Sequence, residues 1–188
     1  NQGDGTFEDV TESSGMFLNT GIQSFQGQWV DFNGDGRLDL HVIRDRNIYS
    51  NHYYEQQSAM SITPFLEKSA DVGLDVSINC MSSSVADYDN DLDMDIYLTA
   101  FPGDQNWLLV NNDYAFSDVN QATQEIPMND LQVDAICWAA NWLDVDNNGH
   151  EDLHVASGFS EYTNYPSILD VYNKPDKLFF NENGSFTE

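Results

Sequence analysis

The chain has 188 residues, of which 40% are hydrophobic and 13% aromatic, so it can build a core and is not globally disordered. Its net charge of −26, from 32 acidic against 6 basic side chains, argues against nucleic acid and anionic membrane surfaces as partners. No apolar run is long enough to span a membrane. Because the chain starts at Asn1 rather than at Met, we expect a processed or excised segment.

An oxygen-rich nonapeptide lies at 31–39 and reads Asp-Phe-Asn-Gly-Asp-Gly-Arg-Leu-Asp. Acidic or amide side chains occupy its first, third, fifth and ninth positions. Oxygen ligands suit a hard divalent cation, and Ca²⁺ takes roughly six to eight of them. The glycine at the sixth position allows the sharp bend that lets residues on both sides face one ion.

The same turn returns at 87–95 and at 144–152, each copy starting 56 or 57 residues after the one before. A constant period of this length indicates a chain built of repeats. We therefore predict about three calcium ions, held by side-chain oxygens at positions one, three, five and nine of the turns. These predicted ligands are Asp31, Asn33, Asp35 and Asp39; Asp87, Asp89, Asp91 and Asp95; and Asp144, Asp146, Asn148 and Asp152.

Each turn lies between two runs that have the apolar alternation of half-buried strands. The runs before the turns are 26–31, 82–87 and 139–144, and the runs after them are 38–42, 94–98 and 153–155. Third strands are predicted at 47–51, 107–111 and 177–181, and fourth strands at 64–67, 115–118 and 185–188. A further copy of the fourth strand is predicted at 5–9.

Four short strands in each repeat of about 56 residues is the plan of a propeller blade. The fold class predicted is all-β: a β-propeller segment of three four-stranded blades, which forms an incomplete ring because closed propellers need about four to eight blades. The predicted repeats are approximately 12–68, 69–119 and 120–188, with 1–11 completing a preceding blade. Exposed strand edges invite pairing, so further blades or copies of the chain are expected partners.

The turn pattern, followed by Leu-x-Val, resembles the calcium loop of FG-GAP/VCBS repeats. The opening Asn-Gln-Gly-Asp-Gly-Thr-Phe-Glu-Asp-Val-Thr is similar to the spacer of the bacterial and cartilage-acidic-protein branch of that family. This resemblance implies an extracellular propeller, usually seven-bladed and related to the integrin α head. It implies roles in adhesion, in ligand or sugar binding, or in support of attached enzyme domains. It also implies a main-chain oxygen ligand at position seven, from Arg37, Asp93 and His150.

Two turns depart from the pattern. The second has Leu92 where the pattern has glycine, and a leucine in the left-handed conformation costs about 1–2 kcal/mol. Its five aspartates favour the ion, so we expect the site to survive with altered geometry. The third turn has Asn148 at position five and therefore neutralises a cation less well.

The turns have two alternatives to a propeller calcium loop. An EF-hand or dockerin needs a carboxylate near position twelve and a following helix, whereas position twelve here is Val42, Leu98 or Val155 within a strand-like run. The turns could instead be solvated acidic turns without a metal, because Asp, Asn and Gly favour turns in any case.

No unique catalytic constellation is present, because every tight aspartate cluster recurs at a repeated position. His41 and His154 occupy equivalent strand positions and are interpreted as packing or surface residues. We expect a non-catalytic, secreted, calcium-binding module for adhesion or for binding a glycan or protein ligand, with Ca²⁺ stabilising the first hairpin of each blade. The alternatives are a structural subunit of an extracellular assembly and an accessory part of a polysaccharide-active enzyme.

Long loops on a rigid scaffold often carry binding residues, and a long insertion lies between Ser157 and Lys177. Its aromatic side chains could stack on sugar rings, anchor a protein partner, or pack on their own blade. These candidate ligand-binding residues are Phe159, Tyr162, Tyr165 and Tyr172.

The tryptophans and cysteines fall within or beside strand runs. The predicted core tryptophans are Trp29, Trp107, Trp138 and Trp142. Cys80 and Cys137 occupy equivalent places in two repeats, and buried free thiols are favoured over a disulfide between the repeats. Asn183 lies in a glycosylation sequon, and its modification stays open.

Overall fold

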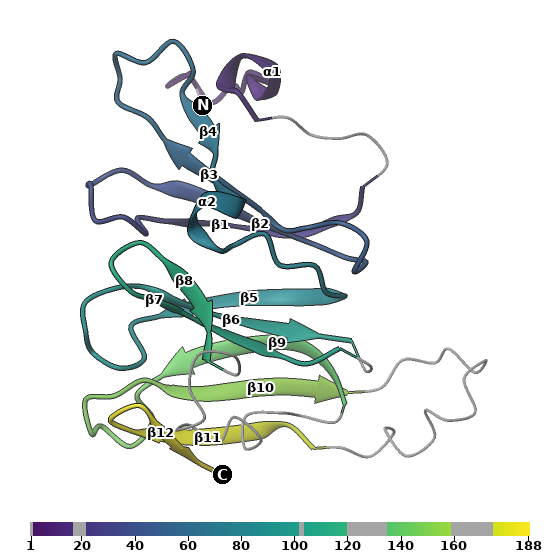
Figure 1. Ribbon diagram of the computed structural model, residues 1–188, viewed down its shortest axis with the longest axis vertical. Helices are drawn as coiled ribbons and strands as arrows, with labels where there is room; N and C mark the ends of the chain where they lie inside the picture. Colours follow the sequence, from purple (N-terminus) through teal and green to yellow (C-terminus); the bar gives the residue numbers. More distant parts are fainter. Residues whose placement is uncertain (1, 17–21, 102–103, 120–134, 159–174) are drawn as a thin grey trace, which may run out of the picture.

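A computed structural model describes residues 2–16, 22–101, 104–119, 135–158 and 175–188 (Figure 1). Within these ranges the strands form three separate four-stranded antiparallel sheets, each with its strands in chain order. No sheet closes into a barrel, and the prediction of an all-β segment of propeller blades is confirmed. No helix in the described ranges has the length and apolar character needed to cross a membrane.

The three sheets are three blades stacked side by side along the chain (Figure 1). The first blade contains β1 (Ser24–Val30), β2 (Asp39–Arg44), β3 (His52–Gln56) and β4 (Phe65–Glu67). The second contains β5 (Cys80–Ala86), β6 (Asp95–Ala100), β7 (Trp107–Asn111) and β8 (Phe116–Asp118). The third contains β9 (Ile136–Leu143), β10 (Asp152–Gly158), β11 (Lys177–Glu182) and β12 (Ser185–Thr187).

Single helical turns precede the first two blades, α1 (Thr11–Ser14) and α2 (Ser69–Val72). Each ends at a glycine in the left-handed conformation, Gly15 or Gly73. A Cβ on Gly15 would lie 2.6 Å from the carbonyl oxygen of Phe65, and one on Gly73 would lie 2.3 Å from that of Phe116. Only glycine therefore allows the chain to pass so close to the fourth strand of the blade it leads into.

The third strand of the first blade was predicted at 47–51, and this was wrong, because β3 begins five residues later than that range does. The prediction aligned Asn51 with the asparagine that ends β7. In the structure, Asn51 Oδ1 accepts a hydrogen bond from the Arg44 N–H at 2.9 Å. Asn106 Oδ1 accepts from the Ala100 N–H at 2.8 Å in the same way. Asn51 therefore marks the start of a third strand and not its end.

Residues 5–9 do not form the additional strand that was predicted. Their backbone is held locally, since Asp4 and Asp9 each accept a hydrogen bond from the N–H two residues later. Phe7 is 80% exposed. None of the three described sheets includes this segment as a paired strand.

A β-bulge interrupts the first strand of every blade at an equivalent position. The unpaired residues are Phe25, Met81 and Trp138, each facing a register shift in the pairing with the second strand. A bulge inserts an extra residue and redirects its side chain. The core prediction for Trp138 was wrong for this reason, as 44% of its surface is exposed.

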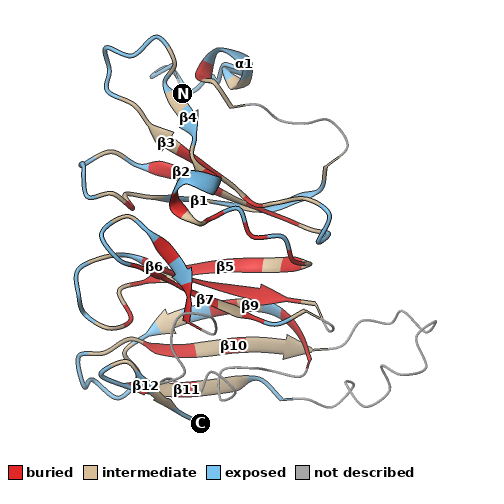
Figure 2. Ribbon diagram, in the orientation of Figure 1, coloured by how far each residue is buried: buried red, intermediate tan, exposed pale blue. Residues whose placement is uncertain are grey.

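The core lies between the blades rather than in one common centre. Each inner blade face packs against the neighbouring sheet, so the second blade is buried on both sides (Figure 2). The first interface joins Phe32, Ile43 and Tyr53 of the first blade to Ile96, Leu98 and Leu109 of the second. The second interface joins Tyr88, Tyr97 and Leu108 of the second blade to Leu153, Val155 and Phe179 of the third.

Cysteine and tryptophan positions follow from this arrangement. Cys80 and Cys137 are buried free thiols in different interfaces, as favoured from the sequence, and burial raises the pKa of both. Trp107 and Trp142 pack against the two cores as predicted. Trp29 does not, because its face of the first blade has no described sheet against it, and it is 53% exposed.

Two buried asparagines link neighbouring blades. Asn111 Nδ2 at the end of β7 donates to the Phe32 carbonyl of the first blade at 3.1 Å. Asn181 Nδ2 in β11 donates to the Tyr88 carbonyl of the second blade at 2.7 Å. Each asparagine is fully buried. Each therefore satisfies a carbonyl of the preceding blade's turn that would otherwise be buried without a partner.

Replacing Asn111 with alanine should lower the free energy of unfolding by about 1–3 kcal/mol, since it leaves the Phe32 carbonyl buried without its donor. Urea unfolding measures this change. The neighbouring exposed Asn112→Ala is the matched control and should cost less than about 0.5 kcal/mol. Equal losses in the two variants would contradict a role for Asn111 in joining the blades.

Candidate metal centres

The oxygen-rich turns connect the first and second strands of each blade, and each ends on the first residue of the second strand. Two residues in every turn have a positive φ, at positions four and six. They are Gly34 and Gly36, Asn90 and Leu92, and Asn147 and Gly149. The sequence prediction recognised only position six. Asparagine at position four tolerates this conformation better than most side chains do.

Leu92 adopts the left-handed conformation expected of it, with φ of 78°. Its side chain is 88% exposed, so packing does not offset the backbone strain of about 1–2 kcal/mol. The second turn nevertheless has the same hydrogen-bonded form as the other two. The groups that hold this form are the aspartates at positions one and nine.

The first aspartate of each turn folds the backbone around its own carboxylate. Asp31 accepts hydrogen bonds from the N–H groups of Asp35 at 3.1 Å and Gly36 at 2.8 Å. Asp87 and Asp144 accept from the same two positions of their own turns, all at 3.0 Å. These bonds curl each turn around the carboxylate at its first position.

The ninth aspartate is the most buried charged group of each turn. Asp39, Asp95 and Asp152 are 0%, 1% and 1% exposed. One carboxylate oxygen accepts the N–H of turn position two, at 3.4, 3.2 and 2.9 Å respectively. The other accepts an N–H from the third strand at 2.8 Å in all three blades. One carboxylate thus joins the turn, the second strand and the third strand.

Burial makes the charged forms of Asp39 and Asp95 electrostatically unfavourable. Desolvation raises the pKa of Asp39, and it raises the pKa of Asp95 to about 8 despite two backbone hydrogen bonds. The nearby carboxylates of Asp89 and Asp91 raise the Asp95 pKa further. Burial, followed by the charge of Asp91, also raises the pKa of Asp89. A cation among these groups would favour their charged forms.

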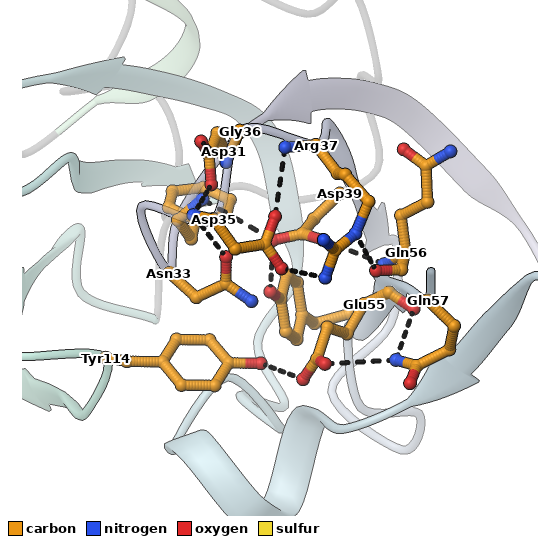
Figure 3. A network of polar contacts seen from close by, with 12 residues as sticks. Asp31, Asn33, Asp35, Gly36, Arg37, Asp39, Glu55, Gln56, Gln57 and Tyr114 are labelled. Carbon is orange, nitrogen blue, oxygen red and sulfur yellow. Dashed lines mark hydrogen bonds and ion pairs between the residues drawn. The ribbon is translucent and has the colours of Figure 1, made fainter. Parts of the chain in front are cut away.

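The first turn contains donors of its own (Figure 3). The Arg37 guanidinium pairs with the Asp35 carboxylate, and Arg37 Nε donates to the Gln56 carbonyl at 3.0 Å. The Tyr53 hydroxyl donates to Asp39 Oδ2 at 2.5 Å. The Arg37 side chain therefore lies against the predicted ligand Asp35.

Position seven has other contacts in the other two turns. Asp93 accepts the N–H of Asp113 at 2.9 Å. His150 Nδ1 lies 2.7 Å from Asn90 Nδ2, which also donates to the Gly149 carbonyl of the next blade at 3.1 Å. The contacts of Asp93 and His150 are thus with residues of other segments, and a main-chain ligand at position seven stays a prediction.

Carboxylate oxygens converge in the second and third turns. One oxygen from each of Asp87, Asp89 and Asp91 lies within 4.8 Å of the others, and the same holds for Asp144, Asp146 and Asp152. Asp89 Oδ1 is buried and has no hydrogen-bond partner, which is the condition a cation ligand would relieve. The all-oxygen donor set fits Ca²⁺. In the third turn, Asn148 Oδ1 accepts the His150 N–H at 2.7 Å, as Asp91 Oδ1 accepts the Asp93 N–H at 2.9 Å in the second.

Residues 31–98, from the first turn to the strand after the second, match the family model of the FG-GAP-like repeat. The chain contains an FG-GAP-like repeat. This finding confirms the resemblance and is consistent with the propeller-type blades of the fold. A search of curated proteins found no match. The third turn, beyond the matched residues, has the same hydrogen bonds to its first and ninth aspartates as the first two.

The other candidates from the sequence divide into three groups. His41 is buried, its pKa is lowered to about 4 by desolvation, and its Nδ1 lies 3.5 Å from Ser83 Oγ at a blade interface. His154 Nε2 lies 3.8 Å from an Asp176 oxygen near the surface. The insertion aromatics lie outside the described residues, so their ligand-binding role stays a prediction. These residues are Phe159, Tyr162, Tyr165 and Tyr172.

In a calcium chelator, we expect stability to fall as the pH rises from about 4 to about 8. The pKa of Asp95 is about 8 in the folded chain against an ordinary value of 3.8. The folded state therefore keeps this proton over a range where the unfolded chain has released it, and stability is lost as the pH rises. Each pKa unit corresponds to about 1.4 kcal/mol.

Urea unfolding at about pH 5 and about pH 8 measures this dependence. Asp95→Asn should reduce the difference between the two values, whereas the exposed Asp113→Asn is the control and should leave it in place. A free energy of unfolding that stays level or increases toward pH 8 would contradict the proposed cost of the buried carboxylate.

Proposed function

We propose that this chain is a non-catalytic, extracellular propeller module whose turns bind Ca²⁺ and whose loops bind a protein or glycan ligand. The observation that carries the proposal is the buried aspartate at position nine of each turn, which faces other carboxylates. A buried charge is unfavourable unless it is paired or coordinates a metal. Millimolar calcium outside cells would fill sites of moderate affinity.

The chain's own residues prepare the site before any ion binds. The first aspartate fixes the curl of the turn, and the ninth aspartate ties the turn to the third strand. Asp87, Asp89 and Asp91 then supply converging oxygens in the second blade, and Asp144, Asp146 and Asp152 supply them in the third. When bound, the ion supplies positive charge that offsets the repulsion among these groups.

In the first blade, the predicted ligands Asp31, Asn33, Asp35 and Asp39 all lie in one turn (Figure 3). Arg37 offers its side chain to Asp35 in this structure. A bound ion and this guanidinium would compete for the same carboxylate. We therefore assign the first turn to the same class of site as the others, with Arg37 as its internal competitor.

A binding role is supported by the difference between the hairpins, which the ninth aspartate holds, and the loops at the strand ends. We expect the hairpins and their turns to be rigid because the ninth aspartate, at the start of the second strand, also accepts an N–H from the third strand. Loops at the ends of such strands can then be held in one conformation for a ligand. The repeated aspartate clusters are accounted for by this structural role, which supports a module without catalysis.

Calcium should raise the thermal unfolding temperature of the chain above its value in EDTA. A ligand at about one hundred times its dissociation constant stabilises the folded state by about 2.7 kcal/mol for each site. Because the chain has a net charge of −26, salt alone will also stabilise it. The control is therefore sodium chloride at matched ionic strength.

The paired variant Asp87→Asn with Asp144→Asn replaces one charged ligand by a neutral amide in each of two turns and should lose most of the gain due to calcium. Exposed Asp113→Asn should keep it. If calcium and matched sodium chloride gave the same unfolding temperature, the calcium-binding part of the proposal would be wrong.

A further inference from the structure

The second turn contacts the third turn across the boundary between their blades. Asn90 Nδ2, at position four of the second turn, donates to the Gly149 carbonyl at 3.1 Å and lies 2.7 Å from His150 Nδ1. An amide nitrogen carries two N–H donors and no acceptor, so His150 Nδ1 is the acceptor and one side chain serves both partners. The contact joins residues that are 59 and 60 positions apart in the sequence.

A buried asparagine of the third blade holds the same two turns together. Asn181 Nδ2 donates to the Tyr88 carbonyl of the second turn at 2.7 Å and to the Glu151 carbonyl of the third turn at 3.1 Å. Asn181 is 0% exposed, whereas Asn90 is an exposed residue. One buried amide therefore fixes the two turns beside each other, and Asn90 makes a second link between them at the surface.

The exposed link acts on one peptide group of the third turn, the one between Gly149 and His150. Its carbonyl accepts from Asn90, and its N–H donates to Asn148 Oδ1 at 2.7 Å. Because a peptide group is planar, hydrogen bonds at its carbonyl and at its N–H fix its orientation. This peptide leads directly to the His150 carbonyl, which is the main-chain ligand predicted for the third turn. Asn90 therefore helps to set the direction in which the next blade presents that oxygen.

The first turn cannot make the equivalent link to the second. Its position four is Gly34, which has no side chain. Gly34 and Asn90 both have a positive φ, of 68° and 61°, so the backbone of the second turn can accept glycine at this place. The Asn90 side chain is thus not needed for the form of its own turn, and its contacts serve the turn of the following blade.

We infer that Asn90 is a positioning residue for the third calcium site, so that this site is complete only when the second turn lies against it. The inference rests on the proposed calcium binding and adds to it a residue that is not a ligand. Groups that orient metal ligands from outside the coordination shell typically contribute about 10- to 100-fold to metal affinity. Removing the Asn90 side chain should therefore weaken calcium binding at the third turn about tenfold and leave the first and second turns unchanged.

Isothermal titration calorimetry of calcium into the full chain tests this inference, with the bound ions counted by native mass spectrometry. Asn90→Gly removes the link and places at position four the residue that the first turn already has there. Asn147→Gly is the matched control, because Asn147 is also exposed, stands at position four of its turn and has the same φ of 61°. We expect one site to weaken about tenfold in Asn90→Gly and no site to weaken in Asn147→Gly.

A double variant shows which turn loses affinity. Asp144→Asn weakens the third site by itself, so adding Asn90→Gly to it should cause little further loss. If Asn90→Gly acted on its own turn instead, the double variant would have two weakened sites. Urea unfolding in EDTA checks that each variant is folded, and Asn90→Gly should keep the urea midpoint of the wild type because the link is exposed.

The outcomes separate this inference from the proposed function. A wild-type chain that binds no calcium would contradict both. Four results would overturn the inference alone, given a wild type that binds calcium: no weakened site in Asn90→Gly, equal weakening in Asn147→Gly, two weakened sites in the double variant, or a urea midpoint of Asn90→Gly that falls in EDTA.

Discussion

The buried carboxylate at position nine of each turn is the constraint on which the rest of the blade depends. It accepts one N–H from the turn and one from the third strand while it starts the second strand. Three segments that are separate in the sequence are thereby held at one point. The same carboxylate is buried away from water, which costs desolvation free energy. A cation or an internal hydrogen-bond donor must offset that cost. In the first blade the Tyr53 hydroxyl contributes to that role.

The turn is also the point at which one blade holds the next. The N–H of Tyr88 is bound by Asp95 in its own blade, and its carbonyl accepts Asn181 from the following blade. Its ring stacks on Phe186 of that same following blade. Local order in a turn therefore contributes directly to packing between sheets. Because the apolar core lies at these interfaces, conditions that loosen a turn are expected to loosen the blade contact as well.

Sequence reasoning predicted the turns, the hairpins and the fourth strands, because their signals are local: oxygen-bearing side chains with glycine, and apolar alternation. It misplaced the third strand of the first blade, since Asn51 and Asn111 look alike, but Asn51 bonds to the second strand of its own blade and Asn111 to the turn of the preceding blade. It also placed Trp29 in a core, because the pattern shows which face is apolar without showing what covers it. The link from Asn181 to Tyr88 spans 93 residues and has no local signal. The left-handed conformation at position four of each turn was not predicted, and the backbone angles of Gly34, Asn90 and Asn147 show it in all three copies.

The most direct test of the central claim is the number of calcium ions bound to the folded chain, counted by native mass spectrometry. Three turns with a buried ninth aspartate predict three ions per chain, and replacing Asp95 with asparagine should reduce the count by one. A chain that carries no specifically bound calcium, or whose count is unchanged by that substitution, would contradict the account.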